Sequence, residues 1–186
     1  MISGWSKSCL PGLIKLDLKM KKTGVFVILF LLSMSCTIES DDVASASDTL
    51  RQELNSFIDQ WHRDAATADP AYFDKMSATA VYIGTDPTEH WTRDEFRKWS
   101  QSYFDSGEAW DFEPVERNLY FSESGQVAWF DELLATWMGT CRGSGVLIRK
   151  NGAWLMEHYH LSISVPNEAT RAVIEIIANE KPVEQE

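Results

Sequence analysis

Residues 142–165 read RGSGVLIRKNGAWLMEHYHLSISV, two β-prone runs on either side of an Asn-Gly pair at 151–152. An Asn-Gly pair between such runs is the strongest short-range signal of a β-hairpin, because both residues tolerate the positive φ of a two-residue turn. The sequence therefore predicts antiparallel strands over 142–150 and 154–165, joined by a tight turn.

The predicted turn also sets which residues of the two strands face each other. Across a two-residue turn, His158 is expected opposite Gly145 and His160 opposite Gly143, on the face that carries Trp154. Glycines opposite the histidines leave open volume, as a pocket wall would, although a bulge or bend at the glycines needs no ligand. His158 is a candidate general acid or base because imidazole titrates near neutrality; the alternative is a pair of core histidines with satisfied ring nitrogens.

The chain before this hairpin changes from helical to β patterns. Apolar residues recur at helical spacing over 48–68, Asp69-Pro70 begins a second helix, and a capping box at 92–95 begins a third. The expected strands before the hairpin are 80–84, 112–122 and 126–137. Helices followed by an antiparallel meander predict an α+β fold with the helices on one face of a curved sheet.

Two groups of residues resemble a known family. The first is Ile83-Gly84-Thr85-Asp86-Pro87 with Glu89, Trp91 and the capping box; the second comprises 142–147, 151–154, 158–162 and 165–167. On these residues the chain is similar to SnoaL-like (polyketide cyclase-like) domains, in the superfamily of nuclear transport factor 2 and ketosteroid isomerase. The resemblance implies a cone-like α+β fold, with three N-terminal helices packed on a strongly bent antiparallel sheet of four or more strands.

The resemblance implies a pocket but no single activity. The superfamily includes cyclases, isomerases and dehydratases as well as binding and dimerising modules, so the fold does not identify the chemistry. The chain has no residue-by-residue match to the catalytic set of one enzyme. Three functions stay open: a module that binds a small apolar or aromatic ligand, an enzyme that transfers protons on a carbonyl compound, and a homodimeric or partner-binding module.

Asp131 lies within an apolar strand pattern, VAWFDELL. Because side chains alternate between the faces of a strand, Trp129 and Asp131 share one face, opposite to Glu132. A carboxylate beside a tryptophan in a dry pocket would have a raised pKa and could abstract a proton next to a carbonyl. The alternatives are an exposed charge or a salt bridge with Arg142 or Arg149. The length of the next turn decides the face of Asp131.

The expected site combines Asp131 and His158 as catalytic residues with a set of ligand-binding residues. That set is Tyr82, Trp129, His160, Arg142 and Trp61. Aromatic side chains are the usual lining of small-ligand sites and equally the usual core of a small domain. We expect no cofactor and no metal, because the His-x-His pair supplies two ligands and a zinc site needs a third and a fourth.

The N-terminus resembles an export signal. Lysines up to Lys22 precede an apolar run at 25–32, and Cys36 follows small residues, as in a bacterial lipoprotein signal. We expect a leader at 1–35, with Met20 as an alternative start, and lipid attachment at Cys36, with plain secretion as the alternative. The apolar run is shorter than the ~20 residues that a spanning helix needs.

The composition of the remaining chain indicates how it divides into segments. A flexible acidic and Ser-rich tether is expected at 36–48, then the domain at 49–168, and a C-terminal helix and acidic tail at 169–186. The net charge of -11 disfavours nucleic-acid partners. The same charge disfavours binding to anionic lipid surfaces, so membrane contact is expected only through a lipid on Cys36. A homodimer is expected through apolar residues on the outer face of the last strand. These residues are Leu155, Tyr159, Leu161 and Ile163.

Overall fold

A computed structural model describes the backbone of residues 39–179 and the side chains of residues 47–179. The predicted leader and Cys36 lie outside the described residues. Within 39–179 no helix combines the length and the apolar character that a membrane span requires. The elements are α2 (Glu39–Ala66), α3 (Ala71–Asp74), β1 (Met76–Ile83), β2 (His90–Thr92), α4 (Arg93–Trp99), α5 (Gln101–Ser106), β3 (Glu113–Phe121), β4 (Val127–Thr136), β5 (Gly139–Lys150), β6 (Ala153–Ile163), η1 (Asn167–Ala169) and α6 (Thr170–Asn179).

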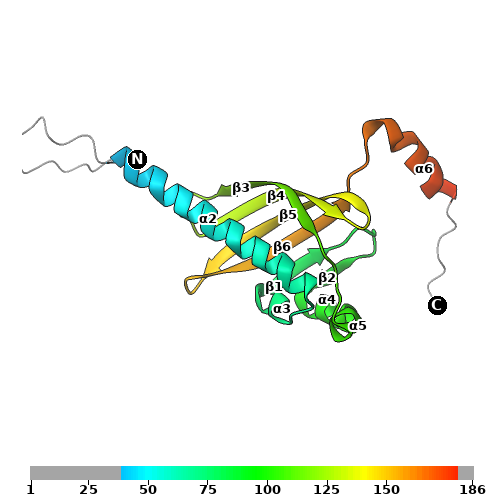
Figure 1. Ribbon diagram of the computed structural model, residues 1–186, viewed down its shortest axis with the longest axis horizontal. Helices are drawn as coiled ribbons and strands as arrows, with labels where there is room; N and C mark the ends of the chain where they lie inside the picture. The colour runs from blue at the N-terminus through cyan, green and yellow to red at the C-terminus, as the bar shows by residue number, and fades with distance from the viewer. Residues whose placement is uncertain (1–38, 180–186) are drawn as a thin grey trace, which may run out of the picture. The chain divides into compact units, whose positions relative to one another are not determined.

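Six strands form one sheet in the order β2-β1-β6-β5-β4-β3 (Figure 1). Neighbouring strands are antiparallel except β1 and β6, which run parallel. The predicted α+β class is confirmed, but the sheet is mixed rather than wholly antiparallel. The parallel pair forms because β6, the last strand of the meander, inserts between β5 and the early strand β1.

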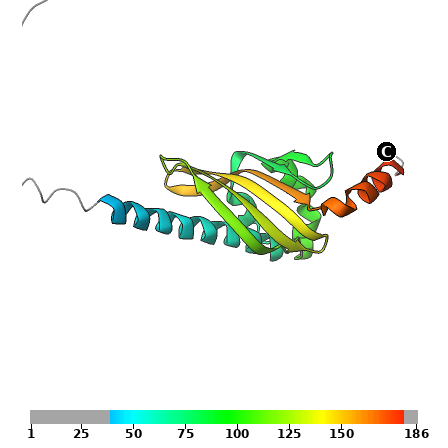
Figure 2. The same ribbon diagram turned by 90° about the horizontal axis from the view of Figure 1, so that it is seen from above.

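From residue 47 onward, helix α2 lies along one face of the sheet (Figures 1 and 2). Its buried residues Leu54, Ile58, Trp61 and Ala65 recur every three or four positions and form one apolar stripe. The helix begins at Glu39, so helical backbone occupies most of the segment 36–48 in which we expected a flexible tether. That polar stretch contains neither glycine nor proline, and it can therefore continue a helix without a break.

The predicted third helix is present as two segments. Its capping box is confirmed, since the Thr92 side chain accepts from the backbone N–H of Glu95 and the Glu95 side chain accepts from that of Thr92. The helix breaks at Ser100, whose hydroxyl donates to the carbonyl of Phe96 at 2.7 Å, and α5 follows. Gly107 ends α5 with a φ of 81°.

The predicted hairpin turn at 151–152 joins β5 and β6, but the register changes further along the strands. Leu147 pairs with Met156, whereas Val146 pairs with His158, so Glu157 is one extra residue in β6. Such a residue is a β-bulge, and it moves every later side chain to the opposite face of the sheet. The predicted pairing is therefore correct near the turn and wrong beyond Glu157.

The bulge is held by neighbouring strand β1. The carboxylate of Glu157 accepts hydrogen bonds from the hydroxyls of Ser77 and Thr79, the latter at 2.8 Å. The backbone N–H of Met156 donates to the carbonyl of Lys75 at 2.8 Å, just before β1 begins. The extra residue in β6 therefore has polar partners that lie about eighty positions earlier in the chain.

Candidate functional site

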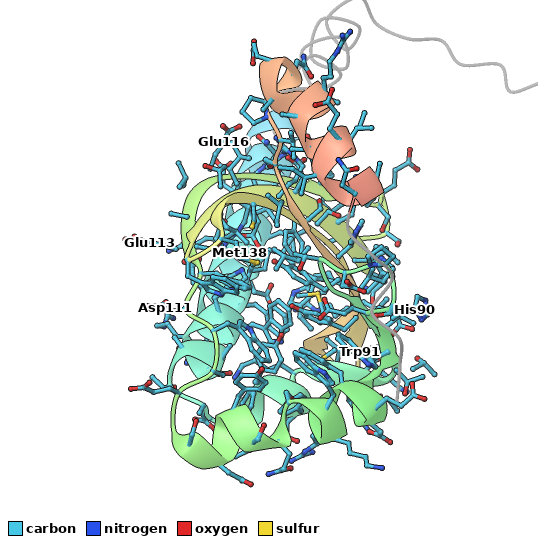
Figure 3. The ribbon with its side chains drawn as sticks, turned by 90° about the vertical axis from the view of Figure 1, so that its right-hand side faces the viewer. His90, Trp91, Asp111, Glu113, Glu116 and Met138 are labelled. Carbon is cyan, nitrogen blue, oxygen red and sulfur yellow. The ribbon has the colours of Figure 1, made fainter. Side chains whose placement is uncertain are left out.

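An aromatic cavity of about 180 Å³ opens between α4, α5 and the β4–β5 turn. Figure 3 looks toward this end of the sheet, with Met138 on one side and Trp91 on the other. The lining includes two polar side chains, Thr85 and Glu89. Its aromatic residues are Tyr82, Trp91, Phe96, Trp99, Tyr103, Trp110, Phe112 and Trp137. Since an apolar cavity of roughly 150 Å³ accommodates benzene, this one has room for a small organic molecule.

The lining rings hold one another in place. Tyr82 and Phe96 stack with their centroids 3.8 Å apart, and the centroids of Trp91 and Trp99 are 4.7 Å apart. Ring contacts at these distances stabilise a fixed arrangement. Toward solvent the lining is open, since Trp99 is 44% exposed and Trp137 84% exposed. The cavity thus combines a packed floor with an exposed aromatic rim.

Glu89 is half-buried and folds over the end of β1. The backbone N–H of Asp86 donates to Oε2 of Glu89 at 3.2 Å, and the N–H of Gly84 donates to the Glu89 carbonyl at 3.0 Å. Burial and the nearby charge of Glu89 raise the pKa of the Tyr82 phenol, so this hydroxyl stays protonated at neutral pH. The cavity therefore has a carboxylate and a neutral phenol close together at one side.

A second polar group is buried between α2 and the sheet, and we name it the Glu132 cluster. The Glu132 carboxylate lies on the inner face of β4, where Oε1 meets Nε2 of His62 at 2.7 Å and Oε2 accepts from Nε of Arg117 at 2.8 Å. The hydroxyl of Tyr159 donates to Oε1 at 3.4 Å. Arg117 also pairs with Asp59 at 2.7 Å. The cluster thus ties α2, β3, β4 and β6 together.

The Glu132 carboxylate is held in its charged form. Burial alone raises its pKa, but the hydrogen bond and charge of His62 and the charge of Arg117 outweigh burial and hold the pKa of Glu132 below its ordinary value. An ionised carboxylate only accepts hydrogen bonds, so Nε2 of His62 is the donor. When the imidazole is neutral, its other nitrogen, Nδ1, is the basic one.

His62 also lines a second cavity, of about 300 Å³. The other lining residues are Asp59, Arg63, Asp111, Phe112, Glu113 and Pro114. Phe112 belongs to the walls of both cavities, and its ring centroid lies 6.4 Å from that of His62. The imidazole and the aromatic cavity are therefore on either side of a shared wall.

Comparison with known proteins identifies the fold family. A family model described as a SnoaL-like domain matches residues 54–166. The chain belongs to the SnoaL-like family. A search of curated protein sequences finds no match.

Solved structures show the same fold in proteins of low sequence identity. A candidate scytalone dehydratase from Novosphingobium aromaticivorans has a TM-score of 0.55 at 9% identity, over 66% of this chain and 89% of that one. An NTF2-like protein of unknown function from Pseudomonas putida has a TM-score of 0.53 at 15% identity, over 63% and 89%. A candidate ketosteroid isomerase from Parabacteroides distasonis has a TM-score of 0.50 at 13% identity, over 61% and 86%. The likeness confirms the cone-like fold.

In this SnoaL-like domain, Asp131 lines neither the aromatic cavity nor the cavity beside His62. It lies on the outer face of β4, where its Oδ1 meets Arg142 at 3.3 Å and Asn118 at 3.2 Å. The prediction of a dry site around Asp131 is wrong, and the alternative salt bridge with Arg142 is present. The reason is the β4–β5 turn, which has two residues, 137–138, and so puts Asp131 on the face opposite to Trp154.

His158 and His160 also lie on the outer face of the SnoaL-like sheet, because the bulge at Glu157 reverses their orientation. Burial and the charges of His160 and His90 lower the pKa of His158, so its imidazole is neutral at neutral pH. Neither Asp131 nor His158 lines the aromatic cavity or the cavity beside His62. Across residues 47–179, no three His, Cys, Asp or Glu side chains are placed to hold a metal ion.

The glycines of β5 make room for side chains rather than for a ligand. Gly143 leaves space for the Tyr159 hydroxyl, and Gly145 for the ring of Phe130. Tyr159 and Leu161 are thus buried in the core, which contradicts their predicted place on an outer dimer surface. The homodimer itself stays a prediction.

The predicted ligand-binding residues separate into three places. Tyr82 lines the aromatic cavity, and its role in ligand binding stays a prediction. Trp61 is core, with its ring stacked on Tyr72 at 4.6 Å between centroids. Trp129 is 45% exposed on the outer face and stacks with Tyr120. The remaining two, Arg142 and His160, are exposed on the outer face.

Sequence reasoning missed Glu132 and His62 as site residues. Glu132 alternates with Phe130 and Leu134, and an acid flanked by apolar residues at two-residue spacing signals a carboxylate on the core face. His62 follows Ile58 by four positions and so belongs to the apolar stripe of α2. Both signals were available, but only the fold shows that the two side chains meet.

Proposed function

We propose that this SnoaL-like domain binds a small organic molecule in the aromatic cavity. The observation that carries the proposal is the lining, in which eight aromatic rings and few polar side chains surround about 180 Å³. Apolar and aromatic walls with a small number of placed polar groups are the general composition of small-ligand sites. Binding there removes apolar surface of both the ligand and the cavity from water. Each Å² of apolar surface buried contributes about 25 cal/mol to the free energy of binding.

The rim of the cavity supports the same function. Three large aromatic side chains around it are substantially exposed, Trp99 at 44%, Tyr103 at 47% and Trp137 at 84%. Clustered exposed apolar side chains mark ligand or partner sites, whereas single ones are ordinary on a protein surface. The floor residues Tyr82 and Phe96 are buried and packed, so a ligand would bind against a formed wall.

Titration of benzyl alcohol and toluene, followed by tryptophan fluorescence, tests the proposal. A saturable change is expected because four tryptophans line the cavity. Ala109→Leu narrows the cavity and should weaken binding at least about tenfold by steric exclusion. Ala135→Leu makes the same change at an exposed position of β4 and should bind normally. Equal affinity in both variants would place the binding site elsewhere.

A second candidate function is proton transfer by His62. The observation in its favour is the hydrogen bond between His62 and buried Glu132 beside a cavity of about 300 Å³. A carboxylate that fixes one imidazole nitrogen leaves the other to act as a base. Exchange of the α-protons of small ketones for deuterium should then be faster with the protein than in buffer. His62→Gln should abolish the excess rate and Asp131→Asn preserve it; no excess rate in the unchanged protein rejects this candidate.

We also propose that the chain is exported and carries a lipid on Cys36. The basic residues, the apolar run and the small residues before Cys36 support this location. Metabolic labelling with a palmitate analogue should mark the unchanged protein but not Cys36→Ala. Cys141→Ala is the matched control, since Cys141 is a free cysteine of the domain. Equal labelling of the unchanged protein and Cys36→Ala would show that Cys36 does not carry the lipid.

A further inference from the structure

The charged side chains that line the aromatic cavity are of one sign. Among the described residues that line it, Glu89 is the sole acidic side chain, and none is lysine, arginine or histidine. Its other neighbours are mainly the rings of four tryptophans, two tyrosines and two phenylalanines. A ligand in this cavity therefore meets one carboxylate and the electron-rich faces or edges of aromatic rings.

Gly84 accommodates the position of the Glu89 carboxylate. The backbone of Gly84 does not have the positive φ that favours glycine. A Cβ at this position would nevertheless overlap the Glu89 carboxylate, which lies directly against the Gly84 backbone. The glycine is thus needed for space rather than for conformation. The hydrogen bond from the N–H of Asp86 to Oε2 fixes the same orientation.

A carboxylate within a set of aromatic rings favours cations. The negative face of a tryptophan or tyrosine ring attracts an ammonium group, and the attraction is stronger where the contact is desolvated. Glu89 adds a direct charge interaction, which repels anions and gives neutral ligands little. The acidic surface, with a net charge of -11 for the whole chain, raises the local concentration of cations further.

We propose that the ligand of the aromatic cavity is an organic cation, an alkylated or quaternary ammonium compound with a short substituent. The inference rests on the proposed binding function and adds the charge of the ligand to it. A quaternary ammonium group has no hydrogen to donate, so ring faces and one nearby carboxylate satisfy it fully. Its bulk also matches a cavity of about 180 Å³.

Calorimetric titration of the full chain with a matched pair of compounds tests the charge. Choline is compared with its neutral carbon isostere, in which a tert-butyl group replaces the trimethylammonium group. Choline should bind at least about tenfold more tightly, the factor that corresponds to 1.4 kcal/mol. Equal or tighter binding of the isostere overturns the proposal.

Three variants locate the charge effect. Glu89→Gln keeps the shape of the side chain and should lower the affinity for choline about tenfold without changing that for the isostere. Gly84→Ala should have the same effect, because the new Cβ displaces the flexible end of the Glu89 side chain and leaves the backbone in place. Glu123→Gln removes an exposed charge from the β3–β4 turn and is the matched control.

The outcomes separate this inference from the binding function on which it rests. If Glu89→Gln and Gly84→Ala retain the full preference for choline, Glu89 does not select the ligand and the proposal is wrong. If benzyl alcohol or toluene binds in an Ala109→Leu-sensitive manner while choline does not bind, the cavity binds neutral ligands and only the cation is rejected. If none of these compounds binds, both proposals fail.

Discussion

Asp131 and Glu132 are adjacent acids on β4, and each pairs with an arginine, but they differ in their surroundings. The Asp131–Arg142 pair lies on the outer face at 3.3 Å, with side chains 32% and 52% exposed. The Glu132–Arg117 pair lies on the inner face at 2.8 Å, with side chains 0% and 7% exposed. The same chemistry thus occurs on both faces of one strand, once in solvent and once in the core.

The comparison shows why alternation along a strand decides what an acid can do. An exposed ion pair contributes little, because water and salt screen it and two flexible side chains must be ordered. A buried pair has lost its hydration, so removal of one partner leaves an unpaired charge in the core. Mutations at the two acids should therefore differ strongly in effect, which gives a series of tests.

Glu132→Ala should have the largest effect, a loss of about 3–5 kcal/mol in the free energy of unfolding. It removes the acceptor for His62 and Tyr159 and leaves Arg117 with Asp59 as its remaining acidic partner. Urea denaturation followed by circular dichroism measures the loss. A change below about 1 kcal/mol would show that the Glu132 cluster does not stabilise the fold.

His62→Phe should cost about 1–3 kcal/mol, because one hydrogen bond to the buried carboxylate is lost while Arg117 stays in place. Phenylalanine fills the position of the imidazole, so the change isolates the polar contact. The same denaturation experiment measures it. A loss as large as that of Glu132→Ala would indicate that Arg117 does not stabilise the buried carboxylate once the hydrogen bond from His62 is lost.

Acid should weaken the Glu132–Arg117 pair only at a pH below the range in which an ordinary glutamate is protonated. The folded-state pKa of Glu132 lies below its unfolded value, so its stabilisation is complete above the ordinary value of about 4.3 and is lost as pH falls through the folded pKa. Denaturation midpoints measured between about pH 7 and pH 3 report this loss. Glu132→Gln should reduce the slope; an unchanged slope would assign the acid sensitivity to other carboxylates.

Asp131→Asn should have the smallest effect, within about 1 kcal/mol of the unchanged protein. The outer pair is exposed, and asparagine can still accept from Arg142 and Asn118. Denaturation at low and high salt provides the check. A loss of several kcal/mol would mean that the two faces of β4 are not as different as their exposure indicates.

The features that depend on local sequence signals were predicted correctly. The Asn-Gly turn at 151–152, the capping box at Thr92 and the helical stripe of α2 are all present where predicted. The cone-like architecture followed from the resemblance to SnoaL-like domains, and the family match supports it. Each of these features depends on residues that are close together in the chain, or on a pattern that runs along the whole of it.

The site depended on features that sequence patterns do not show. The bulge at Glu157 forms through contacts with Ser77 and Thr79, far away in the chain, and it alone moved His158 to the outer face. The turn at 137–138 gave no Asn-Gly signal from which its length could be counted. One extra residue or one uncertain turn length is sufficient to exchange the two faces of a strand. The aromatic cavity itself arises where α4, α5 and the β4–β5 turn meet.

The central claim is that a small molecule binds in the aromatic cavity and not on the outer face of the sheet. Nitrogen–proton NMR of the indole N–H groups during titration with choline or benzyl alcohol tests it directly. The signals of Trp91, Trp99, Trp110 and Trp137 should shift together along one saturation curve, while that of Trp129 stays in place. A saturable shift of Trp129 without the other four would contradict the claim, and so would the absence of any shift.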